Sequence, residues 1–158
     1  MSGELDREMV SYVLQDGVAR ITLDHPQRRN ALSSELVGEL GDRLHLAQGA
    51  EGVRVIVLTN SGSTFCAGAD LKEAREPARA QPGRRRLADI FELMAMGPRP
   101  VVGRIAGHCF GGGVGLAAAC DISVACDDAY FGFSEVRRGV APAVISVVCL
   151  PKMRRCDA

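Results

Sequence analysis

Glycine is concentrated in one short stretch of the chain, where it can serve an electrostatic purpose. Residues 106–121 read AGHCFGGGVGLAAACD, with Gly111, Gly112 and Gly113 consecutive and Gly115 close behind. Three glycines held in one conformation cost backbone entropy, so the chain must gain something from them. Amide N–H groups at the start of a helix have no partners within the helix, and glycine lets a ligand oxygen approach them. The stretch therefore indicates a site for an anion or a polarised carbonyl oxygen.

An earlier loop offers a second donor of the same kind. Residues 65–71 read FCAGADL, a turn of small residues ahead of helical sequence. A flat ligand can lie against such a backbone, and Asp70 stands where an N-cap or a partner of the helix dipole is expected. Each turn follows a buried strand, so both donors should lie on one side of a sheet. Two N–H groups from separate segments would then hold one carbonyl oxygen as it gains negative charge, which is an oxyanion hole.

The same glycines also fit a different interpretation. The run from Gly113 to Ala118 matches the G-x-G-x-x-A fingerprint of dinucleotide-binding folds, after a strand and at the start of a helix. Glu135 lies about 20 residues beyond Gly115, the separation expected of a ribose-binding acid. That acid normally ends the second strand, however, and the residue there, Ala125, is not acidic. From the residues alone both interpretations stay open.

The elements that would position these turns alternate between strand and helix. Strands are expected over 11–14 and 18–23, joined at Asp16-Gly17, and over 53–59, 100–106 and 121–125. Helices are expected from about 34 to 47, from Leu71 to a break near Pro82, over 84–96 and over 143–150, with a loop at 60–70 and irregular chain at 129–139. The runs 53–59 and 100–106 are almost entirely apolar, which predicts strands covered on both faces. The alternation predicts an α/β domain with parallel strands, and the repeated strand-then-helix unit suggests a stacked spiral.

The composition restricts the class of protein. The chain has 158 residues, of which 47% are hydrophobic and 24% charged, as in a globular domain with a real core. Nineteen basic side chains balance nineteen acidic ones, so charge gives no reason to expect nucleic acid or a membrane surface as a partner. The first ten residues do not resemble a signal peptide and no apolar run approaches the ~20 residues of a membrane span, so a cytoplasmic location is expected. Six cysteines without a C-x-x-C pair predict reduced, mostly buried thiols and no metal site.

Four stretches together resemble the crotonase superfamily, whose best-known members are the enoyl-CoA hydratases and isomerases. They are HPQRRNALSSEL (25–36), STFCAGADLKE (63–73), RIAGHCFGGGVGLAAACDISVA (104–125) and YFGFSEVRRGVAPAVIS (130–146), in the order that the family has them. The resemblance implies a crotonase-like spiral of ββα units, with residues 1–158 as a single core domain that lacks the usual C-terminal helical region. It also implies an acyl-CoA thioester as the substrate.

The resemblance assigns roles to individual positions. By motif, the two oxyanion-hole amides fall on Ala69 and Gly112. The CoA nucleotide usually lies along the CAGADL backbone, which makes Ala67, Gly68, Asp70 and Leu71 substrate-binding positions. Arg28, a basic residue that with Arg29 comes just before Asn30, and Gly111 are expected to bind the substrate as well. Coenzyme A is part of the substrate, so neither a separate cofactor nor a metal is expected.

The carboxylates decide which reaction is expected. In the best-known hydratases two glutamates activate water and deliver a proton; the second matches Glu135, but the first would stand at Gly115, which has no side chain. Hydratases of the methylglutaconyl-CoA branch also read GGGVGL and FxEVRxGxxPAxIS, so hydration stays open beside one-carboxylate chemistry such as double-bond isomerisation. The expected enzyme is a lyase or isomerase of fatty acid metabolism. Without the resemblance, Glu135 reads as a solvated or arginine-paired carboxylate.

Members of the family are usually longer, and their last segments seal the acyl pocket and build homotrimers or dimers of trimers. In this sequence, apolar surface is therefore expected to be left uncovered, which predicts poor stability or self-association. Two alternatives to the enzyme remain: a catalytically degenerate fragment that only binds CoA or self-associates, and a dinucleotide-binding domain.

Overall fold

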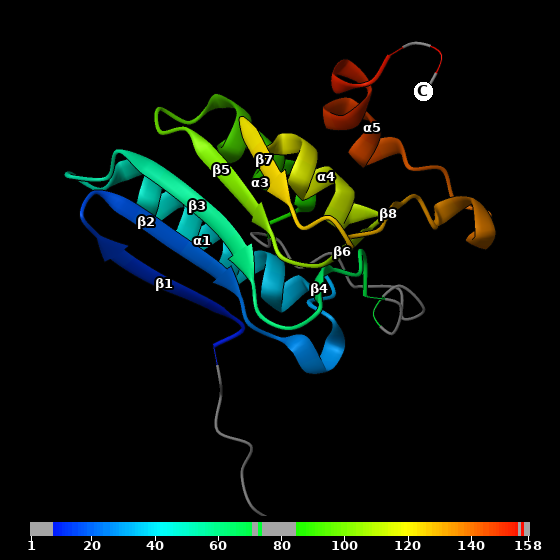
Figure 1. Cartoon of the computed structure of the whole chain (residues 1–158), viewed down its shortest axis with the longest axis horizontal. Coiled ribbons are helices and arrows are strands. Elements are labelled where there is room, and N and C mark those ends of the chain that lie inside the picture. The colour runs from blue at the N-terminus through cyan, green and yellow to red at the C-terminus, as the bar shows by residue number, and fades with distance from the viewer. Residues whose placement is uncertain (1–7, 71–72, 74–84, 155, 157–158) are drawn as a thin grey trace, which may run out of the picture.

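The computed structural model describes residues 8–70, 73, 85–154 and 156 of the chain (Figure 1). The strands are β1 (Val10–Gln15), β2 (Val18–Leu23), β3 (Val55–Asn60), β4 (Thr64–Cys66), β5 (Val101–Ile105), β6 (His108–Phe110), β7 (Ile122–Ala125) and β8 (Phe131–Gly132). The helices are α1 (Ser34–Gly49), α3 (Leu87–Met96), α4 (Gly112–Ala119) and α5 (Ala143–Cys149), with 3-10 turns η1 (Pro26–Arg28), η2 (Glu135–Arg138) and η3 (Leu150–Lys152). In this part of the chain no helix is long and apolar enough to cross a membrane.

The chain repeats one structural unit, which is a strand in a large sheet, a strand in a small sheet and then a helix. The large sheet has the order β1-β2-β3-β5-β7 and the small sheet the order β4-β6-β8. Strands from successive units pair in parallel in both sheets, as β3 with β5 and β5 with β7, and as β4 with β6 and β6 with β8. A single parallel bridge between Leu32 and Ala69 extends the small sheet to the first unit. The predicted spiral of ββα units is therefore confirmed.

The first elements form where local sequence favours them. The hairpin of β1 and β2 turns at Asp16 (φ 51°) and Gly17 (φ 80°), the left-handed pair that a tight hairpin requires. Helix α1 begins after Ser33, whose side-chain oxygen accepts a hydrogen bond from the Leu36 amide at 3.2 Å. Both elements confirm the prediction from sequence.

Helices α1, α3 and α4 lie together on one face of the large sheet, as Figure 1 shows. The side chains that face them, such as Ile56 and Ile105, are buried, whereas Val57 is half-buried and Arg104 is exposed on the other face. The prediction that the strands at 53–59 and 100–106 are covered on both faces is therefore wrong for the described residues. An apolar run shows that a strand tolerates burial, but it does not show whether helices pack on one face of the sheet or on both.

Two further differences concern short elements and boundaries. Strand β4 lies in the segment 60–70 that was expected to be a loop, and strand β6 lies between the strand expected at 100–106 and the glycine cluster. Neither was predicted, because three residues are too few to show the two-residue period of a strand. Helix α3 begins at Leu87 rather than at 84. The predicted helix from Leu71 and its break near Pro82 lie almost wholly outside the described residues.

A buried asparagine connects the turns that precede the two glycine-containing segments. Asn60 accepts a hydrogen bond from the Ala106 amide at 3.0 Å and donates to the Gly62 carbonyl at 3.0 Å. Replacing Asn60 with alanine is expected to lower the free energy of unfolding by about 1–3 kcal/mol, because the Ala106 amide loses its acceptor. Chemical denaturation measures this, with Ser63→Ala, an exposed change in the same loop, as the control that should leave stability unchanged.

Candidate active site

The two turns that the sequence singled out lie directly against each other. Gly68 has a φ of +83°, and a Cβ added there would lie 2.8 Å from the Phe110 carbonyl oxygen and 3.3 Å from the Gly112 nitrogen. A Cβ on Gly112 would in turn lie 3.8 Å from the Cα of Gly68. Only a residue without a side chain fits both the backbone conformation and the close approach at Gly68. The structure therefore brings together the two segments predicted to supply hydrogen-bond donors.

Parallel pairing in the small sheet explains why segments so far apart in sequence meet. Cys66 in β4 is paired with Cys109 in β6, so both strands end at the same edge and both turns begin there. Helix α4 then packs closely onto β4, since a Cβ on Gly113 would lie only 2.4 Å from the Cys66 carbonyl oxygen. The glycines of the triplet thus allow the helix start to approach the first turn.

Each turn keeps one amide unused at the predicted position. Among the bonds made by the described residues, none uses the N–H of Ala69 or the N–H of Gly112. The amides of the flanking residues Asp70 and Gly111 are instead bonded to backbone carbonyls, at 3.3 and 3.0 Å. Gly112 is also the first residue of α4, where the helix dipole adds positive potential. Two such donors on adjacent turns suit an oxygen atom that carries partial negative charge.

Glu135 lies beside this pair of turns. Its Oε1 atom is 2.7 Å from where a Cβ on Gly111 would stand, and Gly111 itself has a φ of +50°. Its Oε2 atom is buried and has no hydrogen-bond partner in the part of the chain that the structure describes. A buried carboxylate oxygen without a partner costs free energy, and such exceptions need an explanation. A fully solvated carboxylate, which is one of the two alternatives drawn from sequence (the other is an arginine-paired one), does not describe this geometry.

The position at which the resemblance expects the other glutamate is filled by apolar atoms. A Cβ on Gly115 would lie 2.6 Å from Cζ of Phe91 and 2.8 Å from Cγ2 of Ile145. Both side chains are buried, and they come from α3 and α5. Sequence periodicity assigns them only to the core, so nothing in the sequence connected them with Gly115. The same packing leaves Gly115 no open surface for a pyrophosphate, which counts against the dinucleotide interpretation.

This packing predicts how the site responds to a restored glutamate. Gly115→Glu is expected to lower the free energy of unfolding by about 1–3 kcal/mol through overpacking, and the buried carboxylate adds to the cost. The double variant Gly115→Glu/Phe91→Ala should regain part of this loss relative to the two single changes added together. Thermal unfolding measures both. Gly38→Glu in α1, where nothing lies within 4 Å, is the control and should not destabilise the chain. Additive effects in the double variant would show that Phe91 does not fill this position.

The predicted CoA-binding positions form a connected patch. Asp70 is buried and its Oδ2 forms an ion pair with Arg28 at 2.5 Å, which ties η1 to the turn at 65–70. The Arg28 side chain remains 40% exposed at this surface. Ala67 is half-buried and bonded through its amide to the Arg29 carbonyl at 3.0 Å. Leu71, the remaining position in this turn, lies outside the described residues, as does the helix that Asp70 was expected to cap.

The cysteines and the histidine near the turns have structural surroundings. Burial raises the pKa of the Cys66 thiol and of the Cys109 thiol to about 12, so both are neutral at physiological pH and poor nucleophiles. His108 accepts a hydrogen bond from the Tyr130 amide through Nδ1 at 3.2 Å, and its ring lies 5.5 Å from the Tyr130 ring. These contacts hold the His108 ring in place beside the small sheet. Four cysteines are buried, whereas Cys126 and Cys156 are exposed.

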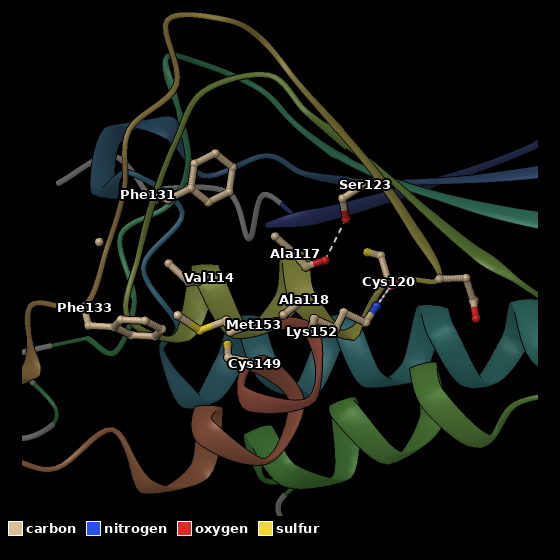
Figure 2. Close-up of a pocket in the computed structure, with 12 residues that line it drawn as sticks. Val114, Ala117, Ala118, Cys120, Ser123, Phe131, Phe133, Cys149, Lys152 and Met153 are labelled. Atoms are coloured by element: carbon tan, nitrogen blue, oxygen red, sulfur yellow. Dashed lines mark hydrogen bonds between the residues drawn. The ribbon is translucent and has the colours of Figure 1, made fainter. Parts of the chain in front are cut away.

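An apolar cavity of about 530 Å³ opens beside α4 (Figure 2). Its lining comes from α4, β7, β8, α5 and the residues that follow α5, and includes Val114, Ala118, Phe131, Phe133, Cys149 and Met153. Burial, and after it the charge of Glu135, raise the pKa of the Cys149 thiol in this lining. No sequence pattern indicates this cavity, because its walls come from elements whose packing is not local.

Comparisons with known proteins agree with this geometry. Residues 14–154 match the family model described as enoyl-CoA hydratase/isomerase. The chain is 40% identical over 136 residues to the "Probable enoyl-CoA hydratase echA6" of Mycobacterium leprae, covering 84% of this chain and 54% of that protein. It is 37% identical over 140 residues to a hydroxycinnamoyl-CoA hydratase-lyase of Pseudomonas fluorescens, covering 84% and 51%. The chain thus spans about half the length of the curated relatives that it matches.

Solved structures of the same family share the fold. An enoyl-CoA hydratase from Shewanella pealeana superposes with a TM-score of 0.88 at 31% identity, covering 96% of this chain and 59% of that one. An enoyl-CoA hydratase from Mycobacterium smegmatis superposes with a TM-score of 0.85 at 33% identity, covering 96% and 60%. With the spiral of ββα units, the paired turns and the matched residues in agreement, the chain belongs to the enoyl-CoA hydratase/isomerase family of the crotonase superfamily.

Proposed function

We propose that this chain forms the part of an acyl-CoA site that binds and polarises the thioester carbonyl. In the proposal, the N–H groups of Ala69 and Gly112 donate hydrogen bonds to the thioester oxygen. The observation that carries it is the contact between the two turns, with an unused amide on each. The substrate class comes from the family, whose relatives are named as hydratases of CoA esters.

The two donors act on charge that develops during the reaction. Removing a proton next to a thioester carbonyl places negative charge on its oxygen, so donors already held in position stabilise the enolate more than the ground state. Loss of one such donor typically costs about 3 kcal/mol of activation free energy, or roughly a hundredfold in rate. The positive end of α4 contributes in the same direction at Gly112.

Glu135 is the proposed acid–base group. Its carboxylate removes a proton from the carbon next to the thioester, and the bonding electrons form an enolate whose charge lies on the oxygen held by the two amides. Glu135 then returns the proton to the far end of the conjugated system, which moves the double bond. Gly115 supplies no second carboxylate, and Phe91 and Ile145 fill the space beside it, so we favour isomerisation over two-carboxylate hydration.

The remaining predicted positions are proposed to hold the rest of the substrate. Arg28 offers a cationic group for CoA phosphates, and the backbone of Ala67, Gly68, Asp70, Leu71 and Gly111 is the surface on which the nucleotide and the thioester lie. The apolar cavity beside α4 is the proposed place for the acyl chain, because its lining matches hydrocarbon. No separate cofactor enters this proposal. The single domain, the cytoplasmic location and the trimeric assembly expected from sequence stay predictions.

A substrate panel tests the proposal on the 158-residue chain. Binding of CoA, NAD and a saturated acyl-CoA is measured by calorimetry, and turnover is measured with a 2-enoyl-CoA and a 3-enoyl-CoA. We expect acyl-CoA binding and conversion of the 3-enoyl to the 2-enoyl ester. Binding without any turnover would replace the proposal with a CoA-binding role, and NAD binding without CoA binding would overturn it.

A further inference from the structure

One buried residue that belongs to neither turn contacts both of them. Leu32 lies between η1 and α1 and forms the parallel bridge to Ala69. Its side chain reaches the second turn, because its Cδ1 atom lies 2.5 Å from where a Cβ on Gly112 would stand. Leu32 therefore connects the two amides to which the proposed function assigns the thioester oxygen.

The backbone of Leu32 fixes the direction of the Ala69 amide. The Leu32 N–H donates to the Gly68 carbonyl at 2.8 Å, and the Leu32 carbonyl accepts from the Asp70 amide at 3.3 Å. In a parallel ladder, the residue between two such bonds points its own N–H to the other side of the strand. On that side the small sheet continues to β6, which leads into Gly112. The Ala69 amide is therefore directed away from Leu32 and toward the side of the second donor.

The side chain of Leu32 supports the start of α4. Gly112 is buried and has no side chain of its own, so its position depends on atoms of other residues. Cδ1 of Leu32 and Cδ2 of Leu87 lie 2.5 and 3.2 Å from where a Cβ on Gly112 would stand. Protein interiors are packed so closely that the loss of even one methyl group is felt by its neighbours. Leu32 thus orients one donor through its backbone and supports the other through its side chain.

Asn30 holds the same segment against the start of β4. It is fully buried; its Nδ2 donates to the Thr64 carbonyl at 2.9 Å and to the Ser61 carbonyl at 3.1 Å, and its Oδ1 accepts from the His25 amide at 2.8 Å. Its φ of +50° is a left-handed conformation that asparagine adopts more readily than most residues. The segment 30–32 is therefore bonded to the chain at the start of β4 and again just after its end. Leu32 cannot shift without breaking buried hydrogen bonds.

We propose that Leu32 is a positioning residue that sets the separation and direction of the two oxyanion donors, Ala69 and Gly112. This inference rests on the proposed function, because it concerns the same two amides. Leu32 acts on the reaction only through them. Donors displaced by a fraction of an ångström lose more of their stabilisation of the enolate than of their binding to the ground state. A change at Leu32 should therefore affect the rate more than the affinity for substrate.

The carbonyl stretching frequency of a bound thioester reports on the two donors without requiring turnover. A saturated acyl-CoA with ¹³C at the thioester carbonyl is bound to the 158-residue chain, and infrared difference spectra of the variants are compared. In the wild type, the two hydrogen bonds should lower the frequency relative to the free ester. Leu32→Ala removes Cδ1 but keeps both backbone bonds. It should lose at least about half of this shift and lower kcat for the 3-enoyl-CoA by about 10- to 100-fold, with KM changed less than about threefold.

A leucine elsewhere in the core provides the matched control. Leu44 in α1 is fully buried, so Leu44→Ala makes the same chemical change. It should destabilise the chain at least as much as Leu32→Ala, yet leave the frequency shift and kcat unchanged. Leu32→Met, with a side chain of similar volume, should retain most of both. If circular dichroism shows that Leu32→Ala is unfolded, Leu32→Val, which also lacks Cδ1, replaces it in every measurement.

The wild type and the variants answer separate questions. A wild-type chain that binds no acyl-CoA, or binds it without a frequency shift, would refute the proposed donors and this inference with them. A wild-type shift that persists in full in Leu32→Ala, or that is lost equally in Leu44→Ala, would overturn the role of Leu32 alone and leave the proposed function standing.

Discussion

Glu135→Gln is expected to reduce kcat for acyl-CoA isomerisation by about 10²–10⁴-fold, the usual contribution of a positioned acid–base group. The amide keeps the size of the side chain but cannot accept the substrate proton. Binding of a saturated acyl-CoA should change little, since the two backbone amides and the CoA-binding surface stay intact. Stability should stay equal or rise, because the amide cannot carry the negative charge that is costly at a buried position without a hydrogen-bond partner among the described residues.

The stability measurement separates a catalytic role from a structural one. If Glu135 holds the η2 turn in place, its replacement by glutamine should lower the melting temperature and weaken binding together with turnover. Glu92→Gln, an exposed change on α3, serves as the control for loss of one negative charge. Full activity in Glu135→Gln would remove this residue from the mechanism while leaving the paired amides in place.

Gly68→Ala is expected to lower kcat/KM by roughly a hundredfold, the cost of losing one oxyanion donor, and also to destabilise the chain. The new Cβ would meet the Phe110 carbonyl oxygen at 2.8 Å and the Gly112 nitrogen at 3.3 Å, and both belong to backbone that cannot rotate away. The turn must shift, which separates the Ala69 amide from the Gly112 amide. The left-handed φ adds about 1–2 kcal/mol for any residue with a side chain.

Gly52→Ala isolates the second effect from the first. Gly52 also has a φ of +83°, but nothing lies within 4 Å of the Cβ that would be added there. This variant should lose only the conformational term of about 1–2 kcal/mol and keep its activity. Equal losses of activity in the two variants would show that contact between the turns is irrelevant to catalysis. Denaturation curves and steady-state kinetics with the 3-enoyl-CoA ester provide both readouts.

Sequence predicted those parts of the fold that depend on neighbouring residues. Asp16-Gly17 sets the first hairpin, and Ser33 with the apolar spacing behind it sets α1, because turn chemistry and capping are local. Strands β4 and β6 escaped prediction since their three residues gain stability from pairing across units, not from their own pattern. The covering of only one face of the large sheet was not predicted either, because it depends on where the helices pack and not on the strand's own residues.

The candidate site shows a similar division. The two small-residue turns and Glu135 could be identified from motifs, and the structure places them together; the roles proposed for Ala69 and Gly112 await measurement. The packing of Phe91 and Ile145 against Gly115 could not be predicted, because it depends on how α3 and α5 meet α4. The buried oxygen of Glu135, which has no partner among the described residues, likewise has no signature in sequence.

The stepwise architecture of the chain has a consequence for the precision of catalysis. Each inner unit pairs its strands with a unit on either side, whereas the outermost described unit, with β7, β8 and η2, pairs with a neighbouring unit on one side only in the described structure. In arrays of this kind local opening costs least at the ends. Glu135 belongs to that outermost described unit, while the Ala69 and Gly112 amides belong to inner ones, so the position of the proposed proton-transfer group depends on the unit with the fewest described neighbours.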